Sequence, residues 1–125
     1  QFIGVEQLSV LRRNCRGEEG AYFRKMMSDL ARRIATMPKV YEQDGKGDGA
    51  IVHLHYFIGN MDWWITEKDI DNDGGEQVQA FGLADLGHGA EFGYVSIREL
   101  IDSGVELDLY WKPRTIGDVK ARRAH

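Results

Sequence analysis

Residues 51–58 read Ile-Val-His-Leu-His-Tyr-Phe-Ile, and this run decides the fold class. It is rich in the β-branched and aromatic side chains that favour strands, and its only polar residues besides tyrosine are two histidines. Successive side chains of a strand point to opposite faces, so the run divides into two sets. One face carries Val52, Leu54, Tyr56 and Ile58, and the other carries Ile51, His53, His55 and Phe57. The run therefore predicts one β-strand whose histidines project side by side.

After this strand the alternating pattern continues. Further strands are expected at residues 63–67, 77–83, 91–95 and 105–111, separated by segments that contain Gly, Asn or Asp. The connections between the first four strands are too short for crossover helices, which predicts a mostly antiparallel sheet of about five strands.

Two short helices are expected among and after these strands. Ser96 and Glu99 form a capping box, which predicts one inserted helix that ends at Gly104. Residues 115–118 repeat the start signal more weakly, which predicts a short C-terminal helix before a frayed basic tail.

Before the strand the apolar residues follow a helical period. A first helix is expected to end near residues 14–17, and a second to run from about residue 18 to residue 37. Glu18 and Glu19 are expected in the first turn of the second helix, where their charge suits the helix dipole. Pro38 ends that helix because proline lacks the backbone donor.

These patterns predict one α+β domain over residues 1–125. N-terminal helices (1–37) pack on one face of the antiparallel sheet (38–125), which carries one short inserted helix and a short C-terminal helix. With 42% hydrophobic residues the chain can form one core. No apolar run approaches the roughly 20 residues that span a bilayer, so no membrane contact is expected.

Cys15 is the only cysteine. With a single cysteine the chain cannot form an internal disulfide, and the reducing cytoplasm is its simplest location. The neighbouring arginines would favour a thiolate, but no partner base is evident, so the sequence leaves the role of Cys15 open between a reactive thiol and an incidental one.

The net charge of −4 hides a strong segregation. Residues 1–39 contain eight Lys/Arg and four Asp/Glu, residues 40–109 three and fifteen, and residues 110–125 five and one. Such a chain can associate with a basic protein or with a second copy of itself through complementary fields. Nucleic-acid binding would require the two basic ends to form one patch with aromatic side chains between the charges. The helical spacing directs Phe23, beside Tyr22, toward a core, so the sequence does not favour a nucleic-acid partner.

Two patterns in the chain could contribute to metal sites. His53 and His55 have a spacing that metal sites use, and with a carboxylate such as Glu67 they would support a metal-assisted hydrolase, although no motif places a third ligand. Residues 69–74 match the first half of a calcium loop, but Ala80 stands where the bidentate glutamate should be. We therefore expect no cofactor, and keep the hydrolase as the alternative function.

An acidic, aromatic surface is the candidate binding site. On an alternating strand, at least one of Trp63 and Trp64 must face away from the main core unless both faces of the sheet are covered. The expected partner-binding residues are Asn60, Asp62, Trp63, Trp64 and Glu67. No catalytic residue is assigned, because the paired acids and Ser96 lie in patterns that predict a solvent face and a helix cap. The sequence therefore favours a non-enzymatic module that binds a protein, and it is compatible with a homodimer.

Several short motifs occur in an order that resembles a known family. They are Met37 to Tyr41, V-H-L-H-Y-F, D-W-W-I-T-E (62–67), A-F-G-L (80–83), E-F-G-Y-V-S-I-R-E-L (91–100) and V-E-L-D-L-Y-W-K-P (105–113). Over about residues 37–118 the chain resembles a small bacterial domain-of-unknown-function family common on plasmids, conjugative elements and other mobile DNA. The resemblance implies an accessory protein of mobile DNA and transfers no catalytic residue.

Overall fold

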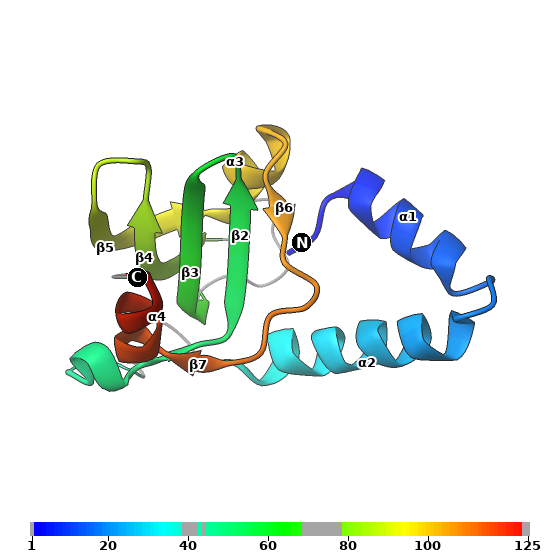
Figure 1. The fold of residues 1–125 in the computed structure, drawn as a ribbon, viewed down its shortest axis with the longest axis horizontal. Coiled ribbons are helices and arrows are strands. Elements are labelled where there is room, and N and C mark those ends of the chain that lie inside the picture. Colours follow the sequence, from blue (N-terminus) through cyan, green and yellow to red (C-terminus); the bar gives the residue numbers. More distant parts are fainter. Residues whose placement is uncertain (1, 39–42, 44, 69–78, 124–125) are drawn as a thin grey trace.

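The computed structural model describes residues 2–38, 43, 45–68 and 79–123 (Figure 1). The helices are α1 (Val5–Asn14), α2 (Gly20–Thr36), α3 (Ile97–Asp102) and α4 (Ile116–Arg123), with one 3-10 turn, η1 (Gly47–Gly49). The strands are β1 (Ile51–Val52), β2 (Leu54–Ile58), β3 (Met61–Lys68), β4 (Gln79–Asp85), β5 (Ala90–Ser96), β6 (Glu106–Leu107) and β7 (Arg114–Thr115). Helices combined with an antiparallel sheet confirm the predicted α+β class.

Five strands form one antiparallel sheet in the order β5-β4-β3-β2-β6, while β1 and β7 pair separately. From β2 to β5 each strand pairs with the next along the chain, which confirms the predicted antiparallel arrangement. The ladder between β3 and β4 shifts register between Ile65 and Glu67. Gly82 lies opposite this bulge, where a Cβ atom would collide with the Trp64 carbonyl, so only glycine fits.

Apolar clusters cover both faces of the sheet. The main cluster consists of Leu30, Met37, Leu54, Tyr56, Trp63, Ile65, Ala80, Val95, Ile97, Leu100, Val105 and Leu107. The second cluster consists of Ala50, Val52, Trp64, Leu83, Trp111, Ile116 and Val119. The main cluster joins the sheet to α2 and α3, and the second joins its opposite face to α4 and the C-terminal segment.

The prediction of one uninterrupted strand over residues 51–58 is wrong at His53. The strand divides there into β1, which pairs with β7, and β2, which pairs with β3 and β6. The backbone N–H of His53 still donates to the Ile65 carbonyl at 2.9 Å. Val52 consequently lies in the second cluster and Leu54 in the main cluster, although strict alternation predicted one shared face.

The predicted strand over residues 105–111 is also shorter than expected. Only Glu106 and Leu107 pair with β2, and the chain then turns, with Asp108 accepting a hydrogen bond from the Tyr110 backbone N–H at 3.0 Å. Because of this turn, Leu107 lies in the main cluster but Trp111 lies in the second. The alternation predicted for this segment therefore ends after Leu107.

The helices α1 and α2 form a hairpin that projects to one side of the sheet (Figure 1). The connection is tight, since a Cβ atom at Gly20 would collide with the Cys15 carbonyl. Helix α2 begins at Gly20, so the prediction that Glu18 and Glu19 lie in its first turn is wrong: both precede it. The C-terminal half of α2 contacts the sheet: Leu30 and Met37, the residue after the helix, belong to the main cluster.

The start signals predicted for the two short helices are confirmed. Ser96 Oγ accepts a hydrogen bond from the Glu99 backbone N–H at 3.3 Å, and Thr115 Oγ1 accepts one from the Asp118 backbone N–H at 3.1 Å. The expected frayed tail is instead helical as far as Arg123. In the described part of the chain, no helix has the length and apolar character needed to cross a membrane.

Candidate functional site

The structure disperses the predicted binding surface. Asn60 is exposed in the turn between β2 and β3, and Asp62 is partly buried beside His55. Trp63 and Trp64 point to opposite faces, as predicted, but they are only 8% and 5% exposed. Glu67 is also buried. The expectation of an outward tryptophan is therefore wrong.

Trp64 is buried because the C-terminal segment folds over its face of the sheet. Ile116 and Val119 of α4 lie in its cluster, together with Trp111. The indole N–H of Trp111 donates to the Val52 carbonyl at 3.1 Å, which fixes this cover to β1. Both faces are thus covered, the one condition under which neither tryptophan needs to face solvent.

His55 lies at the centre of an ion-paired cluster that the sequence did not reveal. Its Nε2 is 2.8 Å from Asp62 Oδ1, and its Nδ1 is 3.0 Å from Asp108 Oδ2. The ring stacks on Trp64, with centroids 5.6 Å apart and planes 12° from parallel, and it also contacts Trp111 at 5.1 Å. The imidazole therefore connects β2, β3 and the turn after β6.

This arrangement suits a structural role. Both ring nitrogens of His55 lie within hydrogen-bond distance of a carboxylate oxygen. Both nitrogens are therefore engaged by side chains of the fold, and neither is left open toward a metal ion or a substrate.

The two histidines of the opening run lie in different environments. Burial, and next the positive charge of Arg33 on α2, lower the pKa of His53 below its ordinary value of 6.5. His55 instead has Asp62 and Asp108 at its ring nitrogens. Among the residues described, no group of three His, Cys, Asp or Glu side chains is arranged to hold a metal ion. The candidate calcium loop at residues 69–74 lies outside them.

Glu67 belongs to a buried polar network. The Gln43 backbone N–H donates to its carboxylate at 3.4 Å. The Gln43 side chain donates to the Thr66 and Ile51 carbonyls, at 2.8 and 3.0 Å, and accepts from the Ile51 N–H at 2.6 Å. Gln43 thus fixes β1 to β3, and Glu67 faces this network and not solvent.

Exposed apolar side chains gather instead on the hairpin of β4 and β5. Leu86, Phe92 and Tyr94 are 53%, 44% and 57% exposed. Phe81 of β4 stacks on Phe92, with ring centroids 6.0 Å apart, and meets Tyr94 edge-on at 5.4 Å. A row of aromatic rings therefore crosses the two strands on one face of the sheet.

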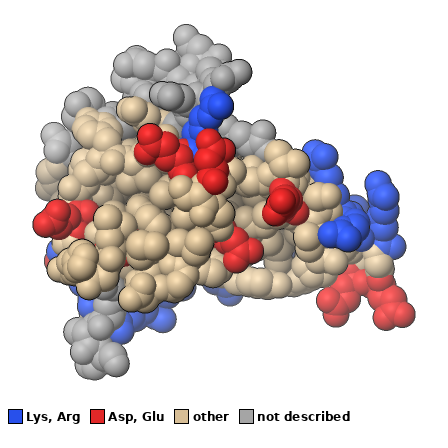
Figure 2. All heavy atoms as spheres, turned by 90° about the horizontal axis from the view of Figure 1, so that it is seen from above, with Lys and Arg blue, Asp and Glu red and all other residues tan. Residues whose placement is uncertain are grey.

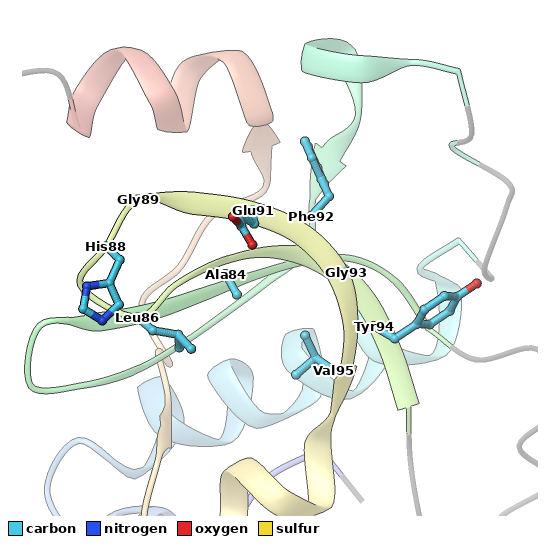
Figure 3. A pocket seen from close by; sticks show the side chains of 9 residues that line it. All are labelled: Ala84, Leu86, His88, Gly89, Glu91, Phe92, Gly93, Tyr94 and Val95. Atoms are coloured by element: carbon cyan, nitrogen blue, oxygen red, sulfur yellow. The ribbon is translucent and has the colours of Figure 1, made fainter.

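The other face of this hairpin is hollow. A cavity of about 390 Å³ is lined by Ala84, Leu86, Glu91, Val95 and neighbouring residues (Figure 3). Figure 3 shows Phe92 and Val95 pointing to opposite sides of β5. Gly93, which lies between them, has no heavy atom within 4 Å of the position a Cβ would take. The strand is therefore accessible from the hollow face as well as from the aromatic face.

The edge of β5 is the longest strand edge without a neighbour in the described structure. All seven residues of β5 pair with β4, and within the described ranges no strand pairs with its outer side. The sequence did predict this strand, and its alternation places Phe92 and Tyr94 on one face. Nothing local shows that a strand is the last of its sheet, so the exposed edge was not predicted.

Fold and surface together define a small α+β domain in which the exposed side chains of Leu86, Phe92 and Tyr94 lie at one edge of an antiparallel sheet. The chain belongs to the family described as "Protein of unknown function (DUF2958)", whose model matches residues 25–116. This confirms the resemblance to a domain-of-unknown-function family, and the match begins within α2, earlier than the motifs had indicated. Comparison with curated proteins and with solved structures gave no match.

Proposed function

We propose that the protein is a small non-enzymatic binding module that adds an extended segment of a partner protein to the outer edge of β5. The observation that supports this function is the seven-residue edge flanked by Leu86, Phe92 and Tyr94. Unpaired backbone groups of an edge strand bind a further strand, and pockets beside it select alternate side chains. Folded proteins usually protect such an edge with charge, proline or a bulge.

The partner segment has a defined chemistry. Side chains on one of its faces would lie along the rings of Phe92 and Tyr94, which favours apolar or aromatic residues at alternate positions. Glu91 is exposed on β5, and residues 40–109 carry fifteen acids against three bases. These charges favour Lys or Arg between the apolar positions of the partner. The partner is therefore an extended basic-apolar segment of another protein.

The setting of this function is part of the proposal. The motifs that resemble proteins of plasmids and conjugative elements support an accessory role in mobile DNA. The free thiol of Cys15, close to the Met27 sulfur at 3.4 Å, is compatible with work in the reducing cytoplasm.

A displayed library of random linear peptides tests the edge. Gly93→Lys places a charged side chain on β5 where the structure has open space, and should abolish selection because lysine on an edge blocks strand addition. Gly17→Lys is the matched control, since Gly17 is exposed between α1 and α2 and its Cβ position is 3.6 Å from the Asn14 carbonyl oxygen, an ordinary contact. Phe92→Ser should weaken selection by removing one aromatic contact.

The expected result is a set of peptides with apolar residues at alternate positions and Lys or Arg between them, retained by the Gly17→Lys variant. Failure to enrich any such set, or equal capture by the Gly93→Lys variant, contradicts the proposal. Sedimentation of the free protein supplies a second test. A dimer that Gly93→Lys dissociates would identify a second copy as the occupant of β5 and overturn the assignment to another protein.

A further inference from the structure

A second surface lies on the opposite side of the molecule from β5, between α2 and the turn that follows β6. It is a groove of about 340 Å³, whose walls include Tyr22, Lys25 and Arg33 of α2 and Tyr110 and Lys112 of the turn. We call it the α2 groove. It brings together the two basic ends of the chain, residues 1–39 and 110–125, which the sequence alone does not place next to each other.

The charges of the α2 groove are mostly positive. Asp29 is its one acidic lining residue among those described, and it is already paired with Lys25 at 2.8 Å and with Arg32 at 3.4 Å. Arg33 and Lys112 form no ion pair within 4.0 Å with any described residue. Figure 2 shows several Lys and Arg side chains at the helical end of the molecule, with acidic side chains beside them at the same end. Within the part of the chain that the structure describes, the groove therefore has three cationic lining residues, Lys25, Arg33 and Lys112, against the single acid Asp29, whose pKa the hydrogen bond from Lys25 and the charges of Lys25, Arg32 and Arg33 lower.

Exposed aromatic rings stand beside these cations. Tyr22 is 54% exposed on the α2 wall and Tyr110 is 67% exposed on the facing turn. Trp111 lies between the walls, largely buried, with the Arg114 guanidinium 4.4 Å from its ring centre. Neither tyrosine belongs to a core cluster, although the ring of Tyr22 meets that of Phe23 edge-on with centroids 5.2 Å apart.

We propose that the α2 groove binds single-stranded nucleic acid. Bases would stack on Tyr22 and Tyr110, and the phosphates would lie at Arg33 and Lys112. Sequence-tolerant binding of single strands combines a positive groove with aromatic side chains on which bases stack, and the α2 groove has both. The sequence set one condition for nucleic-acid binding: the two basic ends must form one patch that also contains aromatic side chains. The α2 groove meets it, because Tyr22 from the first basic segment and Lys112 from the last line the same groove.

A single strand fits this groove better than the other anionic ligands. An acidic protein segment would use Arg33 and Lys112 but has no general need for two exposed tyrosine rings. A duplex presents its phosphates outside stacked bases, so Tyr22 and Tyr110 could not reach the base faces. This inference is independent of the proposed strand addition, which takes place at β5.

Fluorescence anisotropy with a labelled single-stranded oligothymidylate tests the inference on the full chain. Tyr22→Ser and Tyr110→Ser should each weaken binding about fivefold or more, because each removes the stacking of one base. Tyr94→Ser is the matched control: it removes an equally exposed tyrosine from β5 and should leave the affinity unchanged.

The charges are tested by salt dependence. Arg33→Gln combined with Lys112→Gln should reduce the slope of log affinity against log salt by about 0.7 for each phosphate that the variant no longer neutralises. Lys46→Gln, which removes an exposed lysine from the segment before η1, should keep the wild-type slope. Circular dichroism of each variant establishes that it is folded.

Three results would overturn the inference. The first is a lack of saturable binding of the oligonucleotide by folded wild-type protein. The second is equal affinity of the wild type and the two tyrosine variants. The third is tighter binding of a labelled polyglutamate peptide than of the oligonucleotide, which would identify an acidic protein segment as the occupant of the α2 groove.

Discussion

The two outer strands of the sheet, β6 and β5, differ in whether the rest of the fold occupies their outer edges. At the β6 edge only two residues pair, and both backbone groups of Leu107 are occupied by one side chain of α1: Gln7 accepts from its N–H at 3.0 Å and donates to its carbonyl at 2.6 Å. At the β5 edge seven residues pair inward, and within the described part of the chain no strand lies outside them. One edge is closed by the fold, and the other is left open.

The difference indicates where this domain is stabilised and where it is available to bind. The closed edge lies beside α1 and α2, next to the main cluster and the His55 ion pairs. The open edge carries exposed rings and a hollow. Equivalent substitutions at the two edges should therefore have unequal effects on stability, because burial determines the cost of removing a side chain.

The largest contrast is expected between two leucines. Leu107, on the closed edge, is 2% exposed, and Leu107→Ala should lower the free energy of unfolding by about 2 to 4 kcal/mol. Leu86, beside the open edge, is 53% exposed, and Leu86→Ala should change it by less than about 0.5 kcal/mol. Urea denaturation of both variants measures the contrast. Equal losses would show that the two edges contribute alike to stability.

The next effect concerns the ion pairs of His55. Asp108→Asn removes the charge at Nδ1 while keeping the shape, and should lower the free energy of unfolding by about 1 to 2 kcal/mol, since both groups are partly screened by solvent. Glu91→Gln, at the open edge, is the control and should have almost no effect on unfolding. If Asp108→Asn is also neutral in urea, the cluster does not stabilise the closed side.

Local signals account for what the sequence predicted of this fold. The helical period of α1, the capping box at Ser96 and the short connections from β2 to β5 are all readable within a few residues of chain. Two of the failed predictions have a long-range cause. Trp111 donates to Val52, 59 residues earlier, and this contact accompanies both the break at His53 and the cover over Trp64. Periodicity in a short window cannot show such a contact.

The candidate site was only partly predictable for the same reason. The Gly59-Asn60 turn sets a register in which Phe57 lies opposite Asp62, so Asp62 is a diagonal neighbour of His55 and could have been recognised. Asp108 could not, because it reaches His55 through a turn that replaces the predicted strand. The exposed edge of β5 depends on the strand order, which a single sequence does not supply.

A smaller effect tests the closure of β6 directly. Gln7→Ala removes two hydrogen bonds from Leu107 and should cost about 1 kcal/mol of unfolding free energy. Hydrogen exchange at the Leu107 amide should also become faster. Gln79→Ala, an exposed glutamine at the start of β4, should leave both quantities unchanged. If the Leu107 amide of the Gln7→Ala variant exchanged as slowly as in the wild type, a group other than Gln7 would protect this edge.

The smallest effect is a pH dependence on the closed side, at His53. Because burial and Arg33 lower its pKa in the folded chain, the unfolded chain binds a proton below about pH 6.5 that the folded chain does not. The free energy of unfolding should therefore fall as the pH decreases from about 6.5 through the folded pKa of His53. It should recover fully when the pH is raised above about 6.5. His53→Gln should flatten this part of the profile.

Arg33 allows the two causes of that shift to be separated. Arg33→Gln leaves the burial of His53 in place and removes the nearby positive charge, so the pKa of His53 should rise while remaining below its ordinary value, because burial is the larger cause. NMR titration of the His53 ring in the wild type and in this variant measures both steps. If the pKa of His53 in the variant reached its ordinary value, the charge of Arg33 and not burial would be the dominant cause of the shift. His53 would then no longer distinguish the closed side of the sheet from the open one.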